Sequence, residues 1–107
     1  MNNRLKIAHE FANDIITKGI THIILFGSVA RGDDKKESDI DILIVCKNRE
    51  DIEFNVNNKV FDIIDTYEEF IEAHIMTEDY YNKTKEYSFL KNVLKEGVPL
   101  VGDYWLL

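Results

Sequence analysis

The sequence predicts a small α/β or α+β domain in which helices pack against a small mixed β-sheet. Three observations lead to this fold class. Short isoleucine-rich segments, typical of buried strands, alternate along the chain with segments whose apolar residues recur at helical spacing. The 107 residues match one domain in length, and no repeat or Pro/Gly-rich linker divides them. We therefore expect residues 1–107 to form a single domain.

Composition narrows the range of partners and locations. The formal net charge of −7 disfavours long-range attraction to a polyanion, so a nucleic-acid partner is not expected. The single cysteine, Cys46, rules out an internal disulfide and suits a reducing compartment. The N-terminus lacks the apolar core of a signal peptide, and no apolar run is long enough to span a bilayer. These features predict a cytoplasmic protein with no membrane association.

The first half of the chain is expected to contain a helix and two buried strands. Apolar residues at helical spacing predict a helix over about residues 4–18, and Gly19 can adopt the left-handed conformation that ends a helix. Residues 21–26 predict a buried strand, and a short helix is expected over 28–32. Asp39–Val45 predicts the second strand. Its alternation places Ile40, Ile42 and Ile44 on one face and Asp39, Asp41, Leu43 and Val45 on the other.

The second half is expected to add a third strand and further helices. Residues 46–59 are ambiguous, because their alternating apolar residues and an Asn-Asn pair could also form a hairpin. Val60–Asp65 predicts the third strand. Residues 66–69 have the form of a capping box, which begins a helix carrying Phe70, Ile71 and Ala73. The remaining expected elements are a helix over about 78–96 and a short strand at 100–101.

The residues that indicate chemistry lie between the first two strands. Gly27-Ser28 joins a strand to a helix start, where glycine lets the backbone approach a phosphate and free N–H groups favour an anion. Asp39 and Asp41 follow on one strand face, with Ile40 turned away. Two such carboxylates resist joint ionisation unless a cation lies between them, and Mg²⁺ bridges carboxylates to phosphates. This combination predicts metal-assisted phosphoryl or nucleotidyl transfer.

A third carboxylate would strengthen the site, and the predicted third strand offers two candidates. Asp62 and Asp65 are three residues apart and point to opposite faces of a strand. Asp62 shares its face with Val60 and Ile64, where an aspartate is costly to bury without a partner or a metal. Asp65 precedes Thr66 at the expected helix start, where an acidic residue has an ordinary structural use. We therefore favour Asp62, with Asp65 as the alternative.

These residues resemble the signature of the minimal nucleotidyltransferases in the DNA polymerase β superfamily. That signature is Gly-Ser, ten residues, Asp-x-Asp, and a later strand with a third Asp. Gly27-Ser28 and Asp39-Ile40-Asp41 match at the required spacing. Ala30-Arg31-Gly32 and Ser38 match the form common in minimal members, and Asp62-Ile63-Ile64 resembles the third strand. The resemblance implies a polymerase-β-like nucleotidyltransferase core.

The resemblance also implies ATP or another nucleoside triphosphate as donor, with two Mg²⁺ ions. Asp39 and Asp41 would bind both ions, and Asp62 would bind the one that activates an acceptor hydroxyl and could take its proton. Ser28 and the Gly27-Ser28 backbone would hold the β- and γ-phosphates. Arg31 would be a further phosphate contact, although the residues alone leave a surface ion pair equally open. Pyrophosphate would leave, and a nucleoside monophosphate would remain on the acceptor.

A protein partner is a further implication of the resemblance. Minimal members are often paired with a small helical HEPN protein as a toxin–antitoxin couple, and some are antitoxins that attach AMP to a tyrosine of the toxin. The chain has no room for the acceptor-binding domain of larger relatives, so a dimer mate or a partner protein would recognise the acceptor. The apolar end at residues 104–107 could equally bury against the body of the domain or form an oligomer contact. Two alternatives are a non-catalytic module of the same fold that neutralises a partner by contact, and transfer to a small molecule or RNA.

Overall fold

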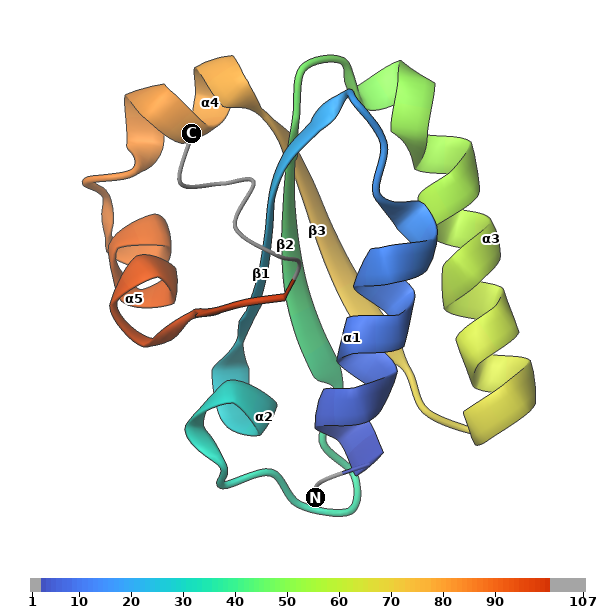
Figure 1. Cartoon of the computed structure of the whole chain (residues 1–107). Coiled ribbons are helices and arrows are strands. Elements are labelled where there is room, and N and C mark those ends of the chain that lie inside the picture. The colour runs from blue at the N-terminus through green and yellow to red at the C-terminus, as the bar shows by residue number, and fades with distance from the viewer. Residues whose placement is uncertain (1–2, 101–107) are drawn as a thin grey trace.

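The computed structural model describes residues 3–100, which form a four-stranded sheet with helices on both faces (Figure 1). In chain order the elements are α1 (Asn3–Ile15), β1 (Ile20–Phe26), α2 (Gly27–Arg31), β2 (Ile40–Cys46), α3 (Arg49–Tyr67), β3 (Ile71–Thr77), α4 (Glu78–Thr84), α5 (Ser88–Glu96) and β4 (Val98–Pro99). α1 and α3 cover one face of the sheet, and α4 and α5 lie against the other. The predicted fold class, a small mixed sheet packed by helices, is confirmed.

The sheet brings three strand ends together. Its order is β3-β2-β1-β4, with β1 antiparallel to β2 and β4, and β2 parallel to β3. α3 supplies the long crossover that parallel neighbours require. Phe26, the last residue of β1, lies opposite Asp41 near the start of β2, and Asp41 lies opposite Glu72 near the start of β3. These three positions therefore meet at the end of the sheet where α2 begins (Figure 1).

The two faces of β2 carry different side chains. Ile40, Ile42 and Ile44 are fully buried in the core formed with α1 and α3. Leu43 and Val45 are buried in a second cluster, with residues of α5. Because side chains alternate along a strand, Asp41 faces the same side as Leu43. The alternation predicted for this strand is confirmed, and it places the carboxylate on the α5 side of the sheet.

The strand predicted over Val60–Asp65 is wrong, because this segment is the C-terminal part of the 19-residue helix α3. The ambiguous residues from 49 onward belong to the same helix. Ile52, Val56 and Ile63 are buried, and their spacing of four and seven residues places them on one helical face. Asn48 caps the first turn through its side chain. A short apolar run fits a buried helix as well as a strand, so the few residues around Val60 do not distinguish the two.

The helix predicted to begin within residues 66–69 is also wrong. α3 continues to Tyr67, and Glu68 adopts a left-handed conformation with φ of 56° that ends it. The next residues form β3, in which Ile71 is buried against the core. A capping box is a local preference, and pairing with β2 outweighs it here because the pairing buries the apolar side of β3.

Smaller departures concern the ends of elements. α1 already ends at Ile15, and the glycine at 19 does not take a positive φ. The single helix predicted over 78–96 is divided into α4 and α5 by a turn at residues 85–87. Leu100 follows β4 and donates a backbone hydrogen bond of 3.2 Å to the carbonyl of Ile23. The rest of the strand predicted at 100–101 and the apolar end at 104–107 lie outside the described residues.

None of the helices within residues 3–100 combines the length and the apolar character needed to cross a bilayer.

Arg4, on the first turn of α1, joins the two segments that lead into β2 and β3. Its guanidinium forms ion pairs of 3.0 Å with Asp34 and with Glu69, and only 10% of the Arg4 side chain is exposed. The same group donates hydrogen bonds to the backbone carbonyls of Lys35 and Lys36. Arg4 therefore fixes the loop before β2 to the turn before β3, and with it the relative position of the two strand starts.

Replacing Arg4 with methionine is expected to lower the free energy of unfolding by about 3 kcal/mol, because Asp34 and Glu69 would lose their buried counter-charge. Urea unfolding followed by circular dichroism measures this loss. Lys6→Met, at an exposed position of the same helix, is the matched control and should change the value by less than about 0.5 kcal/mol. Equal effects of the two substitutions would contradict the role assigned to Arg4.

Candidate active site

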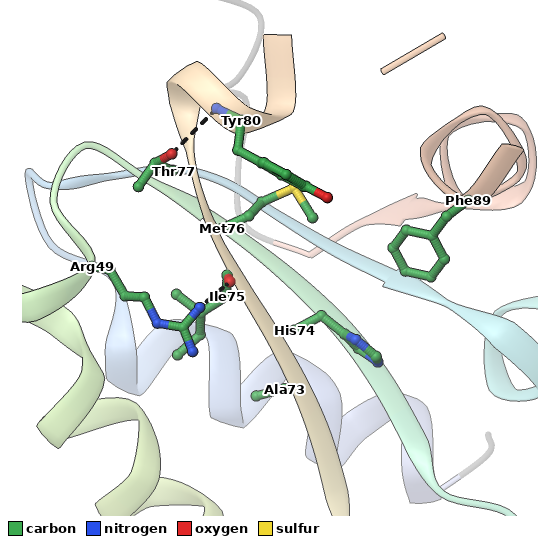
Figure 2. Close-up of a pocket in the computed structure, with 8 residues that line it drawn as sticks. All are labelled: Arg49, Ala73, His74, Ile75, Met76, Thr77, Tyr80 and Phe89. Carbon is green, nitrogen blue, oxygen red and sulfur yellow. Dashed lines mark hydrogen bonds between the residues drawn. The ribbon is translucent and has the colours of Figure 1, made fainter. Parts of the chain in front are cut away.

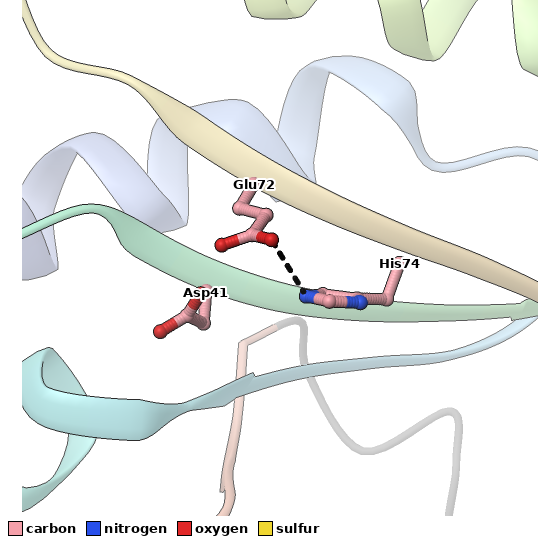
Figure 3. Close-up of side chains that lie close together, drawn as sticks. All are labelled: Asp41, Glu72 and His74. Atoms are coloured by element: carbon pink, nitrogen blue, oxygen red, sulfur yellow. Dashed lines mark ion pairs between the residues drawn. The ribbon is translucent and has the colours of Figure 1, made fainter.

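Two acidic side chains from neighbouring strands lie beside the Gly27-Ser28 turn. Asp41 comes from β2 and Glu72 from β3, and their side chains lie on the same side of the sheet (Figure 3). This is the α5 side, because Asp41 shares a face of β2 with Leu43. His74 is two residues beyond Glu72 and points the same way. One carboxylate oxygen of Asp41, one of Glu72 and a ring nitrogen of His74 all lie within 4.8 Å of one another. The sheet register thus gathers three groups that can each ligate a metal ion.

Gly27 allows the carboxylate of Asp41 to lie against the chain. A Cβ built at Gly27 would overlap Asp41 Oδ2, at a separation that real Cβ contacts do not show. Gly27 also has a φ of 74°, which disfavours residues with a side chain. The glycine is therefore required here for two separate reasons, and one of them is the close approach of α2 to a candidate metal ligand.

Gly27→Ala is expected to lower the free energy of unfolding by about 2–3 kcal/mol, because it adds a clash with Asp41 to the backbone strain. Gly32→Ala is the matched control, since Gly32 has a φ of 81° and open space where a Cβ would lie. It should lose only the strain, about 1 kcal/mol. Chemical denaturation measures both. In an Asp41→Ala background the difference between the two substitutions should shrink, because the closest contact, with Oδ2, is gone and only the Cβ of residue 41 remains, at 3.3 Å. An undiminished difference would contradict the proposed clash.

Asp41 is held in an environment that disfavours its negative charge. Its pKa is raised from 3.8 to about 6, chiefly by burial and then by a hydrogen bond to Glu72 and by the charges of Glu72 and Asp39. The charge of Arg31 acts in the opposite sense. A divalent cation would remove this penalty by compensating the crowded carboxylates. The oxygen-rich group at Asp41 and Glu72 therefore fits a divalent metal ion, and its proximity to the glycine turn fits a phosphate-bearing substrate.

The remaining residues of the predicted motif lie around this group. Asp39 immediately precedes β2 and is exposed, near enough for its charge to act on Asp41. Ser28, in the first turn of α2, is half-buried, and its hydroxyl makes no hydrogen bond to another described residue. Arg31 forms ion pairs of 3.2 Å with Asp33 and 3.0 Å with Glu96. Of the two interpretations left open for Arg31, the surface ion pair is the one seen in the structure.

Asp62 is not brought to the site. Asp62 was predicted to lie on a third strand at Val60–Asp65, but both Asp62 and Asp65 are exposed on α3. α3 packs on the face of the sheet opposite Asp41. The acidic residue that the structure places opposite Asp41 is Glu72, which the sequence analysis missed. The signal that could have found it is the alternation of Ile71, Ala73 and Ile75 with polar or larger residues, which is typical of a strand. This pattern places Glu72 on the strand face opposite those apolar residues.

A pocket of about 510 Å³ adjoins the acidic group along β3 (Figure 2). His74 belongs to both, since it lines the pocket and also lies beside Glu72. The pocket is therefore positioned to receive a substrate group next to the candidate metal ligands. Its lining residues, from α3, β3, α4 and α5, are Arg49, Ala73, His74, Ile75, Met76, Thr77, Tyr80 and Phe89.

A known protein family matches most of the chain and gives its enzyme class. The family described as "Polymerase beta, Nucleotidyltransferase" matches residues 6–103, which is most of the chain. The chain belongs to the polymerase beta nucleotidyltransferase family. As a member of this family it is a nucleotidyltransferase, as the resemblance in its sequence implied.

A curated relative and two solved structures agree with this assignment. The relative, from Methanocaldococcus jannaschii, bears the name "Putative protein adenylyltransferase MJ0604"; it is 42% identical over 99 residues, covering 89% of this chain and 95% of that protein. A crystal structure described as a toxin-antitoxin with AMP-PNP has a TM-score of 0.59 at 19% identity, covering 95% of this chain and 78% of that one. A crystal structure described as "a putative nucleotidyltransferase from Sulfolobus solfataricus" has a TM-score of 0.53 at 24% identity, covering 91% of this chain and 78% of that one. Both structures share the fold of this nucleotidyltransferase.

Proposed function

We propose that this nucleotidyltransferase uses two Mg²⁺ ions to transfer AMP from ATP to a hydroxyl group of a partner protein. The observation that carries the proposal is the meeting of Asp41 and Glu72 beside the Gly27-Ser28 turn. Such an arrangement places charged metal ligands next to a backbone turn that a triphosphate can approach. The raised pKa of Asp41 supports a role in cation binding, because the group gains most when a positive charge arrives.

Asp39 and Asp41 are proposed to hold both ions, and Glu72 takes the place in the site that the sequence analysis gave to Asp62. Bound divalent ions would activate the acceptor hydroxyl and neutralise the charge of the triphosphate. Glu72 is placed to accept the proton of that hydroxyl. The backbone of Gly27-Ser28 and the Ser28 hydroxyl are proposed to hold the β- and γ-phosphates, with Arg31 as an additional contact once it leaves its ion pairs with Asp33 and Glu96.

The proposed reaction forms one bond and breaks one bond at the α-phosphorus. The acceptor oxygen attacks this phosphorus, and the bond from the phosphorus to the oxygen that bridges to the β-phosphate breaks. Pyrophosphate leaves with the bonding electrons, AMP remains on the acceptor, and the hydroxyl proton passes to Glu72. The protein's part is to align these groups and to surround them with fixed charges.

A protein acceptor and a toxin–antitoxin role are the finer parts of the proposal. The name of the curated relative supports a protein as acceptor, and the structural neighbour described as a toxin-antitoxin with AMP-PNP supports both a nucleotide substrate and a protein partner. We propose a small helical HEPN-type toxin as that partner, with this chain as its antitoxin. The acidic net charge of −7 fits a protein partner better than a nucleic acid.

Transfer is tested with ATP radiolabelled at either the α- or the γ-phosphate, together with Mg²⁺ and the candidate helical partner. Label from the α-position is expected on the partner, whereas label from the γ-position should appear only in pyrophosphate. Denaturing electrophoresis separates these products. Absence of α-label on the partner, with both proteins folded and bound to each other, would overturn the proposal, and label on RNA or on a small molecule would redirect it to another acceptor.

Neutralisation by contact alone is a second candidate, because α3 exposes two aromatic side chains on one face. Phe54 and Phe61 are 74% and 65% exposed, and their spacing of seven residues places them two turns apart on the same side. Such a pair can anchor a partner without any chemistry. Under this alternative, the double substitution Asp39→Asn, Asp41→Asn would leave toxin neutralisation unchanged. Under the proposed function it would abolish neutralisation while preserving binding.

A further inference from the structure

We propose that His74 is a direct ligand of the metal ion held by Asp41 and Glu72, so that this position prefers a transition-metal ion such as Mn²⁺ to Mg²⁺. The inference rests on the proposed function in placing a divalent cation at these two carboxylates. It adds a nitrogen ligand to a site otherwise made of oxygen atoms, and with it a preference among metals.

The three ligand atoms lie nearly close enough to one another to bind the same metal ion. The His74 ring nitrogen Nε2 lies 3.8 Å from Glu72 Oε1, and the whole group of ligand atoms falls within 4.8 Å (Figure 3). Two ligands bound to one ion at about 2.1 Å each are separated by at most about 4.2 Å. Small side-chain rotations that move the ligand atoms by several tenths of an ångström therefore bring Asp41, Glu72 and His74 around a single ion. No movement of the strands is needed, because Glu72 and His74 share one face of β3 and Asp41 pairs with Glu72.

The imidazole is held in position by aromatic neighbours. Its ring centroid lies 5.3 Å from that of Phe26 and 5.7 Å from that of Phe89. These contacts come from β1 and α5, and the two phenyl rings also contact each other, with centroids 5.7 Å apart, so the imidazole packs against an aromatic pair. The side chain still keeps 32% of its surface exposed, which leaves the ring open to solvent and to an entering ion. A ligand restrained in this way loses little conformational entropy when a metal binds.

The consequence for metal choice follows from ligand chemistry. Mg²⁺ prefers oxygen ligands and keeps several waters, whereas imidazole binds first-row transition ions well. Replacing one oxygen ligand by His74 should therefore raise the affinity for Mn²⁺ more than the affinity for Mg²⁺. If instead His74 only packs against Phe26 and Phe89 and pairs with Glu72, the choice of metal will not depend on it.

The test uses the full chain with Mn²⁺ alone as the probe. Pulsed electron paramagnetic resonance of the bound Mn²⁺ should show magnetic coupling to a ligand nitrogen. The signal should disappear in His74→Gln, and calorimetry should show the Mn²⁺ affinity falling by about tenfold or more, with the Mg²⁺ affinity changing by less than about threefold. No nitrogen coupling in the wild-type protein, or equal losses for both metals, would overturn the inference.

Two further variants keep the result interpretable. His22→Gln is the matched control, because His22 packs on Tyr81 and is absent from the ligand group, so the nitrogen signal should remain. His74→Phe retains a ring against Phe26 and Phe89 and should melt near the wild-type temperature while losing the signal. Retention of the signal in His74→Phe would overturn the inference. The readout is independent of the proposed transfer reaction: nitrogen-ligated Mn²⁺ in a protein that labels no partner would leave this inference standing and refute the proposed function.

Discussion

Replacing Asp41 with asparagine is expected to slow AMP transfer by about a thousandfold, which corresponds to the loss of about 4 kcal/mol of transition-state stabilisation. The amide keeps the size of the side chain but removes the charge that the structure places against Gly27 and Glu72. Single-turnover transfer of α-labelled ATP to the partner measures the rate, and calorimetry should show a parallel loss of Mg²⁺ affinity. Asp65→Asn, on the exposed face of α3, is the control and should leave both values unchanged.

The same substitution is expected to stabilise the metal-free protein at neutral pH. The pKa of Asp41 is raised from 3.8 to about 6 in the folded state, so between these values the folded protein binds more protons than the unfolded chain. Stability therefore falls as the pH rises through this window, and ionised Asp41 destabilises the fold above it. A pKa shift of this size corresponds to a loss of roughly 3 kcal/mol in the free energy of unfolding if nothing screens the charge. Solvent screens this partly exposed carboxylate, so we expect Asp41→Asn to raise the free energy of unfolding by only about 1 kcal/mol.

Urea unfolding in the presence of a chelator measures this gain at two pH values. The variant should exceed the wild-type protein at about pH 7.5 and match it at about pH 4, where the wild-type carboxyl is protonated as well. A variant that is less stable at both pH values would show that Asp41 is a structural residue. A stable variant with wild-type transfer would show that catalysis occurs elsewhere.

Glu72→Gln is expected to reduce transfer by about a hundredfold or more, whereas Asp62→Asn should leave it unchanged. This pair of substitutions compares the carboxylate that the structure places beside Asp41 with the one favoured from sequence alone. Glu72 pairs in register with Asp41, whereas Asp62 lies on α3, behind the opposite face of the sheet. Each change removes one charge and keeps the size of the side chain, so the two variants are directly comparable.

Metal binding gives a second readout for the same pair. Glu72→Gln should weaken Mn²⁺ and Mg²⁺ binding, and Asp62→Asn should weaken neither. The reverse order of effects would require a different arrangement of β3 and α3 from the one described. Wild-type activity in both variants would mean that Asp39 and Asp41 act without a third carboxylate, and would limit the proposed role of β3 to the pocket.

Several features of the site could be predicted because they depend on neighbours in the sequence. The strand before Gly27 and the strand after Asp39 have strong local patterns, and alternation alone assigns Asp41 and Ile42 to opposite faces. The spacing from Gly27-Ser28 to Asp39 is a property of one short segment, since β1 and β2 are adjacent antiparallel strands. That segment was sufficient to indicate the family to which the chain belongs.

The error at Asp62 has a physical cause in the segment between β2 and β3. Its apolar residues fit either a strand or a helix over any short window, and only the full length of α3 shows the helical spacing of Ile52, Val56 and Ile63. With the strand predicted at Val60–Asp65, eleven residues too early, the first residues of the true strand at Ile71–Thr77 were assigned to a helix. A local capping pattern at residues 66–69 reinforced the error.

The sequence by itself determined the fold class and the enzyme family, and it predicted the half of the candidate site that lies on β1, α2 and β2, because local periodicity and spacing encode these. Only the tertiary structure decided that Glu72 and His74 complete the group around Asp41. Parallel pairing of β2 with β3 joins residues separated by the whole of α3, and burial of both strands' apolar faces fixes the register that sets Glu72 opposite Asp41. That register is a property of the packed sheet and leaves no mark in any short stretch of sequence.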